Sequence, residues 1–152
     1  MARESGTRDS GTRARRLARE LLVKALYQWQ LAGHPAEEIL AQFGSLPDYE
    51  RCDRDFFEEL LPRIVADAAA LDVQIARHAT RGVDQLDAVG RAILLLGLAE
   101  LKFRDDVPTK VVINEGVELA KRYGGVDSFK FVNAVLDKSA RDLRPAASGS
   151  QA

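Results

Sequence analysis

Four arginines near the start of the chain are the most distinctive group of side chains that could bind a ligand. The segment TRARRLAR contains Arg13, Arg15, Arg16 and Arg19 and no acid. At the start of a helix these charges are unfavourable, because the helix dipole favours anions there. Guanidinium groups match phosphate oxygens, and exposed backbone N–H groups add to an anion site. The segment therefore predicts contact with nucleic-acid phosphates, the alternative being a basic helix start exposed to solvent.

A second candidate site lies near the end of the chain, in the segment GGVDSFKFVNAVLDK. Two glycines precede Asp127 and Ser128, which are candidates for capping a helix, and Phe129, Lys130 and Phe131 follow in its first turn. A capped helix start with a lysine and two aromatic rings can hold a phosphate and stack a base. The alternative is an ordinary capped helix whose phenylalanines belong to the core.

Motifs for catalysis or metal binding are absent from the sequence. It has no Walker-type glycine loop, no GxGxxG, no HExxH and no GxSxG. One cysteine, Cys52, and two histidines, His34 and His78, are too few for the usual zinc site of four Cys and His ligands. We therefore expect a protein that is not an enzyme and has no metal or cofactor, although an enzyme with an unrecognised site remains an alternative.

The composition is that of one globular domain. The chain has 152 residues, of which 46% are hydrophobic and 30% charged, and its net charge is −1. Nucleic-acid binding would therefore depend on a local patch. The longest apolar run, residues 92–99, is too short to span a membrane, and the charged start does not resemble a secretory signal. We expect a cytoplasmic location and no membrane association.

Apolar periodicity and helix-boundary residues predict an all-α fold, a compact bundle of about seven helices. The expected helices cover residues 12–31, 35–43, 53–70, 72–79, 87–103, 108–123 and 127–141. Pro62 is expected to kink or split the third helix. Residues 1–11 are predicted to be a disordered arm and residues 145–152 a disordered tail, because both are rich in small and polar residues without periodicity.

The first predicted helix has two distinct faces. Arg15, Arg16 and Arg19 fall within a 100° arc if each residue turns by 100°. The same strip continues through Val23, Leu26, Tyr27 and Gln30. The opposite face, expected to be the core face, consists of Leu17, Ala18, Leu21, Ala25 and Trp29.

The predicted helix over residues 87–103 is apolar on nearly every side, which indicates a place in the middle of the bundle. Gly90 and Gly97 lie seven residues apart on one stripe of it. Either another helix of the same chain crosses closely at this stripe, or a partner protein docks there.

Three segments together resemble one family. They are ALYQWQ (25–30), DVPTKVVINEGVELAKRYG (106–124) and DSFKFVNAVLDK (127–138), and they follow the basic start RARRLARE. In their order and spacing they are similar to the NusB family of bacterial transcription antitermination factors. The resemblance covers residues 12–144.

The resemblance implies a single all-α RNA-binding domain over residues 12–144, arranged as two small helical subdomains. It also implies a non-catalytic role: binding the single-stranded boxA element of nascent ribosomal-RNA transcripts as a heterodimer with NusE, a ribosomal small-subunit protein. The complex would join other Nus factors on RNA polymerase and suppress premature termination.

The resemblance also assigns residues to these contacts. The family's RNA-binding residues would fall on Arg15, Arg16, Arg19, Asp127 and Phe131. The basic segment and the last helix start described above add Arg13, Ser128 and Lys130 as RNA-binding candidates. The family's NusE interface would include Tyr27 and the position of Gly90 and Arg91. Gln30, on the same strip as Tyr27, and Leu94, on the same helix as Gly90, are further candidates for this interface. Gly90 is a departure, because the family often has a glutamate there, and Leu17 replaces an arginine of some members.

Other interpretations remain open on the sequence. One is a protein–protein adaptor whose arginines are only solvated. Another is the related RNA-binding domain that precedes certain ribosomal-RNA cytosine methyltransferases, although this chain ends just after the last predicted helix and has no room for a catalytic domain. A monomer and a homodimer are both compatible with the sequence.

Overall fold

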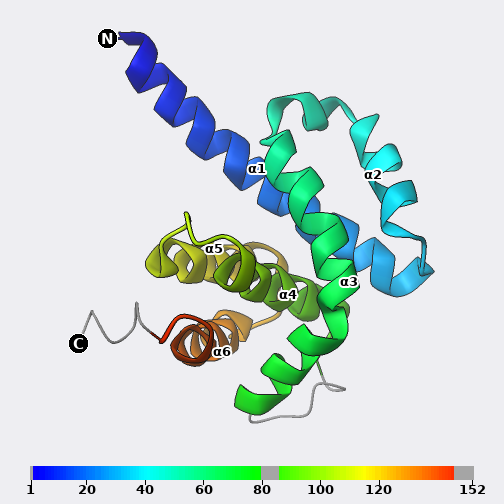
Figure 1. The fold of residues 1–152 in the computed structure, drawn as a ribbon, viewed down its shortest axis with the longest axis vertical. Helices are drawn as coiled ribbons and strands as arrows, with labels where there is room; N and C mark the ends of the chain where they lie inside the picture. Colours follow the sequence, from blue (N-terminus) through cyan, green and yellow to red (C-terminus); the bar gives the residue numbers. More distant parts are fainter. Residues whose placement is uncertain (1, 80–85, 146–152) are drawn as a thin grey trace. The chain divides into compact units, whose positions relative to one another are not determined.

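The structure, a computed structural model, describes residues 2–79 and 86–145, with side chains from residue 11 onward. This part of the chain is all-α and contains no strand, which confirms the predicted class. The elements are α1 (Ala2–Ala32), α2 (Ala36–Gly44), the 3-10 helix η1 (Pro47–Arg51), α3 (Arg54–His78), α4 (Ala88–Phe103), α5 (Thr109–Tyr123) and α6 (Ser128–Leu143) (Figure 1). No helix in these ranges is both long and apolar enough to cross a membrane.

The chain divides into two compact units, with the boundary inside α3 between Pro62 and Arg63. The first unit contains α1, α2, η1 and the first turns of α3, and the second contains the rest of α3 with α4, α5 and α6. Two small helical subdomains are what the family resemblance implied.

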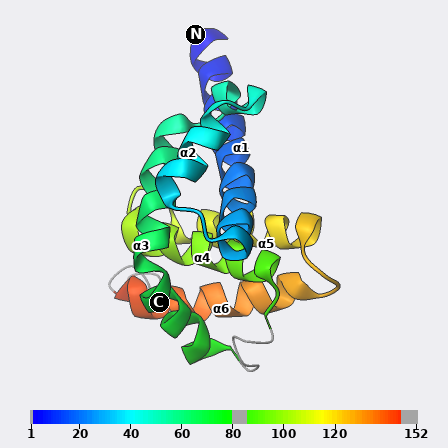
Figure 2. The same ribbon diagram turned by 90° about the vertical axis from the view of Figure 1, so that its right-hand side faces the viewer.

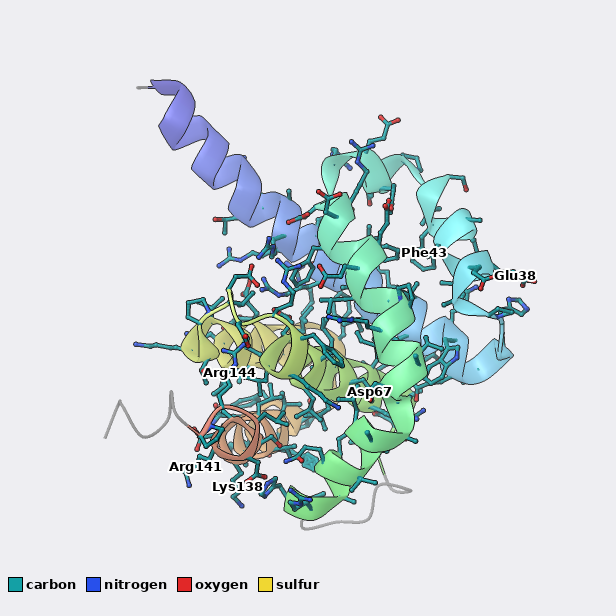
Figure 3. All side chains as sticks on the ribbon, viewed as in Figure 1. Glu38, Phe43, Asp67, Lys138, Arg141 and Arg144 are labelled. Carbon is teal, nitrogen blue, oxygen red and sulfur yellow. The ribbon has the colours of Figure 1, made fainter. Side chains whose placement is uncertain are left out.

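The first unit is held together by aromatic rings. Phe43 of α2 stacks against Phe57 of α3, with ring centroids 5.8 Å apart, and Tyr49 of η1 meets Phe57 edge-on at 5.5 Å. Figure 3 shows Phe43 on the inner side of α2 and Glu38 directed away from the unit. Between α1 and α2, the side-chain amides of Gln28 and Gln42 are hydrogen-bonded at 2.7 Å. Buried apolar area and these ring contacts together fix α2 on the unit.

The second unit is built around α4, whose residues from Ala92 to Leu101 are all buried. Figures 1 and 2 show α4, α5 and α6 grouped together. A Cβ atom built on Gly97 of α4 would lie 2.8 Å from a methyl carbon of Leu136 of α6, and one on Gly116 of α5 would lie 2.7 Å from the other. Both glycines therefore make room for the same leucine, and three helices meet at one side chain.

The prediction for the glycine stripe of α4 is confirmed at one position only. At Gly97 a helix of the same chain crosses closely, as expected. At Gly90 no other helix does: a Cβ atom would meet Leu86 and the Asp87 side chain, each at 3.1 Å. Asp87 caps α4 by accepting a hydrogen bond from the Gly90 N–H at 2.7 Å. Gly90 thus belongs to the cap of its own helix.

Arg144, directly after α6, closes the opposite end of the second unit (Figure 3). Its guanidinium donates to the backbone carbonyls of Leu101 (2.9 Å), Glu100 (3.0 Å), Arg104 (2.7 Å) and Val107 (2.7 Å). The last carbonyls of an α-helix have no partner within the helix. Arg144 therefore caps the C-terminus of α4 and ties the loop before α5 to the end of α6.

Polar contacts join the second half of α3 to α4 and α6. Arg91 makes a two-point ion pair with Asp72, with Nε–Oδ1 and Nη2–Oδ2 distances of 3.0 and 2.6 Å. Asp142 of α6 is hydrogen-bonded to His78 at 2.5 Å and accepts from Gln74 at 2.8 Å. These hydrogen bonds from His78 and Gln74 lower the pKa of Asp142 below its ordinary value. The α3 helix is thus connected to its unit by charged groups as well as by apolar packing.

Three predicted helix boundaries were wrong: the start of the first helix, the end of the third and the start of the fourth. The first helix begins at Ala2 instead of Thr12, so residues 2–11, expected to be a disordered arm, are helical. Extending an existing helix avoids the cost of nucleating a new one, because each added residue forms one further backbone hydrogen bond. The last of the predicted tail, residues 146–152, lies outside the described residues.

The third helix is longer than predicted. Helix α3 runs through Pro62 without a break and includes residues 72–78, which were expected to form a separate helix. A proline inside a helix costs about 3 kcal/mol. Leu60, Leu61 and Ile64 beside it are fully buried, and their burial offsets that cost.

The packing at Leu136 can be tested by a double-mutant cycle. We expect Leu136→Ala to cost about 2–5 kcal/mol in free energy of unfolding, because it leaves a cavity among α4, α5 and α6. Gly97→Ala should also destabilise, because its methyl group overlaps Leu136. In the double mutant the Gly97→Ala cost should shrink, since the obstructing methyl groups are gone.

Urea denaturation of the four proteins measures these costs. The matched control is Gly11→Ala in α1, where a Cβ atom would meet nothing within 4 Å. Alanine should stabilise that helix by a few tenths to about 1 kcal/mol. Additive costs for Gly97→Ala and Leu136→Ala would contradict the shared contact.

Candidate nucleic-acid interface

The four arginines at the start of the chain have different environments. Arg13 and Arg16 are exposed, Arg15 is partly exposed, and Arg19 is buried, with 4% of its surface exposed. The sequence predicted Arg15, Arg16 and Arg19 on one cationic strip. The structure keeps all three on α1, but Arg19 is buried, so of the three only Arg15 and Arg16 reach the surface.

Two of these arginines lie against the same aromatic ring. The Cζ atoms of Arg15 and Arg19 are 4.5 and 5.2 Å from the centroid of the Phe56 ring. Arg15 also pairs with Asp53, with its Nε 3.0 Å from the carboxylate Oδ2. Cation–π contacts and ion pairs with an acid offset part of the repulsion among clustered guanidinium groups. Sequence reasoning missed Asp53 and Phe56, because both are distant along the chain and Phe56 resembles any core residue.

The strip that continues along α1 is only partly as predicted. Tyr27 is 40% exposed, and Gln30 is half-buried, with its amide donating to the Leu26 carbonyl at 3.3 Å. Val23 and Leu26 are buried, so the strip that lies opposite the expected core face is itself a packing face at these two residues. Trp29, expected in the core, is half-buried. The buried face of α1 is wider than one stripe because α1 packs against both α2 and η1.

The second candidate site forms the corner between α5 and α6. Asp127 has a left-handed backbone with φ of 63°, and its side chain makes no capping hydrogen bond, so the prediction that it caps the helix was wrong. Capping residues usually have extended backbone, from which the side chain reaches the helix N–H groups. Ser128 instead links the two helices, since its hydroxyl donates to the Ala120 carbonyl of α5 at 3.4 Å. The exposed Asp127 carboxylate lies 3.7 Å from the Lys130 ammonium.

Aromatic and basic side chains surround this corner. Phe129 and Phe131 are both half-buried, so neither is a fully buried core residue. The Lys121 and Lys130 ammonium groups lie 5.2 and 6.0 Å from the centroid of the Phe129 ring. Sequence reasoning passed over Tyr123 and Val126, which are 37% and 96% exposed. The glycine pair between them was the available signal, because it marks a turn that projects its neighbours.

The arginines belong to the first unit of the chain, and the α5–α6 corner belongs to the second. Each of the two candidate sites is therefore described by the contacts within its own unit.

The residues assigned to a protein interface in the second unit are mostly enclosed. Gly90 is buried and Leu94 is fully buried, while Arg91 is partly exposed and engaged with Asp72. A Cβ atom at Gly90 would lie 3.1 Å from side-chain atoms of both Leu86 and Asp87, so a glutamate at this position would require these two side chains to shift slightly. Of the predicted interface residues, Tyr27 presents the largest open side chain.

Two titratable groups of the first unit, Cys52 and Tyr49, have raised pKa values. Burial raises the pKa of the Cys52 thiol, and the neighbouring Asp53 carboxylate raises it further, so the thiol stays protonated. Burial and a hydrogen bond to Glu58 raise the pKa of Tyr49. Across residues 11–79 and 86–145, no three His, Cys, Asp or Glu side chains are grouped so that they could hold a metal ion.

The NusB family model matches residues 16–141 of the chain. The chain belongs to the NusB family. It is 52% identical over 131 residues to the transcription antitermination protein NusB of Alcanivorax borkumensis, a match that covers 86% of this chain and 87% of that protein. The NusB protein of Pseudoalteromonas translucida is 47% identical over 131 residues, covering 86% and 96% of the two chains.

A solved structure supports the same assignment. The fold is similar to that of T. maritima NusB, with a TM-score of 0.74 and 31% sequence identity. The match covers 88% of this chain and 96% of that one. The arginine segment and the α5–α6 corner thus lie within a NusB fold.

Proposed function

We propose that this protein is a transcription antitermination factor that binds boxA-type RNA of nascent ribosomal-RNA transcripts together with NusE. It acts as a binding factor without catalysis, in the cytoplasm, alongside other Nus factors and RNA polymerase. The observation that carries the proposal is the match over 131 residues to proteins named for transcription antitermination. The match covers about nine-tenths of those proteins, so it includes both helical units.

The exposed arginines support RNA binding through the phosphate backbone. Arg13, Arg15 and Arg16 present guanidinium groups at the surface of α1, and such groups bind phosphate oxygens through charge-assisted hydrogen bonds. Phosphate contacts contribute affinity but do not read sequence. Arg19 is buried against Phe56, so we do not assign it a direct phosphate contact.

Selection of the RNA sequence is assigned to the α5–α6 corner. Sequence-specific readers of RNA usually bind single strands, stacking bases on aromatic rings and bonding their edges. Phe131 and Lys130 offer a ring and a cation. The exposed Asp127 carboxylate repels phosphate, but it can accept hydrogen bonds from base amino or imino groups. Ser128, which ties α6 to α5, holds this corner in place.

A protein–protein adaptor without RNA binding is the second candidate. The observation that favours it is that Arg15 and Arg19 are engaged within the protein. Its NusE surface would be centred on Tyr27 and Gln30 of α1, because Gly90 and Leu94 are buried and Arg91 is paired with Asp72. RNA titration of the protein, alone and with NusE, separates the two candidates, because only the first binds RNA and binds it more tightly with NusE present.

Replacement of the exposed arginines tests the phosphate contacts. We expect Arg13→Ala/Arg16→Ala to weaken binding of labelled boxA RNA in fluorescence anisotropy. The slope of log Kobs against log salt concentration should fall by about 0.7 for each lost single-strand contact. The matched control is Lys138→Ala/Arg141→Ala, which removes two exposed positive charges from α6 (Figure 3). Equal losses in the two double mutants would show that only net charge matters.

Replacement of Asp127 tests sequence selection. Asparagine tolerates the left-handed backbone of this position, so Asp127→Asn should leave the melting temperature unchanged. It should alter the ratio of affinities for boxA RNA and for scrambled RNA of the same composition. Identical binding curves for mutant and wild type on both RNAs would remove Asp127 from base recognition.

Replacement of Tyr27 tests the NusE surface. We expect Tyr27→Asp to weaken NusE association at least tenfold in calorimetry, because it puts a charge where an exposed ring would be buried. The circular dichroism spectrum should stay helical, since Tyr27 is 40% exposed. Lys24→Ala, another exposed position of α1, should associate normally. Full-strength binding by Tyr27→Asp would place the interface elsewhere.

A further inference from the structure

Arg15 is held in one orientation by two contacts of different kinds. Its Nε lies 3.0 Å from Asp53 Oδ2, a hydrogen bond in the plane of the guanidinium. Its Cζ lies 4.5 Å from the centroid of the Phe56 ring, which supports the guanidinium from another side. Phe56 is completely buried and therefore a fixed platform. The two contacts together restrict both the position and the tilt of the charged group.

Asp53 is itself fixed by the backbone around it. Its Oδ1 accepts a hydrogen bond from the Phe56 N–H at 3.1 Å, which caps the N-terminus of α3. Its own N–H donates to the Ala14 carbonyl of α1 at 2.9 Å. The carboxylate that binds Arg15 thus belongs to a rigid junction between α1 and the start of α3.

The charge of Asp53 is partly compensated where it lies. A helix N-terminus carries about half a positive charge, and it stabilises an acid placed there. An acid in this position can bind an arginine while repelling an approaching phosphate less than an isolated carboxylate would. The Arg15 side chain is 30% exposed beside it.

We propose that Asp53 is a positioning residue for RNA binding: it holds the Arg15 guanidinium, at the junction of α1 and α3, in the orientation that binds an RNA phosphate. This inference rests on the proposed function. A guanidinium carries five N–H donors, so a bond from Nε to Asp53 is compatible with donation to a phosphate as well. An arginine that is already ordered loses less conformational freedom when it binds.

The opposite role is also physically possible for an acid beside a ligand-binding arginine. If Asp53 competed with phosphate for Arg15, removing its charge would tighten RNA binding. The capped, rigid placement of Asp53 favours positioning, because a carboxylate held by a helix start does not need to be displaced. The two roles predict opposite signs for the same substitution.

Asp53→Asn and the matched control Asp55→Asn decide between them. Asparagine keeps the cap of α3 but removes the charged partner of Arg15. Asp55 is exposed in the first turn of the same helix, so its replacement removes an equal charge nearby. With a fluorescein-labelled single-stranded boxA RNA in anisotropy titrations, Asp55→Asn should bind as well as wild type or slightly better. Asp53→Asn should bind about two- to tenfold more weakly than Asp55→Asn.

The same pair of substitutions in an Arg15→Ala background tests whether Asp53 acts through Arg15. There Asp53→Asn and Asp55→Asn should bind RNA equally, because the group to be positioned is gone. A persisting difference would overturn the inference. So would tighter or equal binding by Asp53→Asn in the normal background.

A measurement without RNA separates this inference from the proposed function. In nitrogen-15 NMR, the Arg15 Nε–Hε signal should exchange slowly with water in the wild type and rapidly in Asp53→Asn, while Asp55→Asn resembles the wild type. Should Asp53→Asn fail to fold, Arg15→Lys removes the same bond while keeping the charge, and it should weaken RNA binding similarly. If the wild type binds no RNA, the proposed function is overturned. If it binds and Asp53→Asn matches Asp55→Asn, only the positioning role is overturned.

Discussion

The close approach of α4, α5 and α6 depends on the side chain of Leu136 and on two glycines, Gly97 and Gly116, which have no side chain to obstruct it. Leu136 fills the space in which a Cβ atom on Gly97 or Gly116 would lie within 3 Å of its methyl groups. Protein interiors are packed as densely as organic crystals, so even one added methyl group forces neighbours to move. The arrangement of the second unit, including the α5–α6 corner, therefore depends on two glycines that look like weak points when each helix is considered alone.

Charged side chains bind backbone groups at helix ends that apolar packing leaves without hydrogen-bond partners. Arg144 satisfies carbonyls at the end of α4, and Asp53 caps the start of α3. In both cases a backbone group that has no partner within its helix is bound, at the end of α4 by Arg144 from 44 residues away and at the start of α3 by Asp53 from three residues away. The same Asp53 binds Arg15, so the structural role and the proposed role in RNA binding are combined in one carboxylate.

The four arginines show how position changes the role of one residue type. Arg13 and Arg16 are exposed, Arg15 is paired with Asp53 and lies against Phe56, and Arg19 is buried against the same ring. A guanidinium is flat and carries a stem of three methylene groups, so it can pack on a ring and still keep its charge. The exposure of the four arginines therefore decreases from Arg13 and Arg16, through Arg15, to the buried Arg19.

The sequence alone determined the all-α class, the buried middle position of α4 and most helix ends, because apolar periodicity, capping residues and the glycine after α1 act locally. It also indicated the family, because three segments in order are more specific than any one of them.

Tertiary structure decided what depends on distant contacts. Pro62 stays inside α3, Val23 and Leu26 are buried, and Arg19 lies beneath the surface, because packing energy from other helices outweighs local preference. Asp127 takes a left-handed backbone and does not cap α6, and Asp53 meets Arg15 across 38 residues. No local sequence pattern predicts a contact such as that between Arg15 and Asp53, because it forms only when the helices pack together.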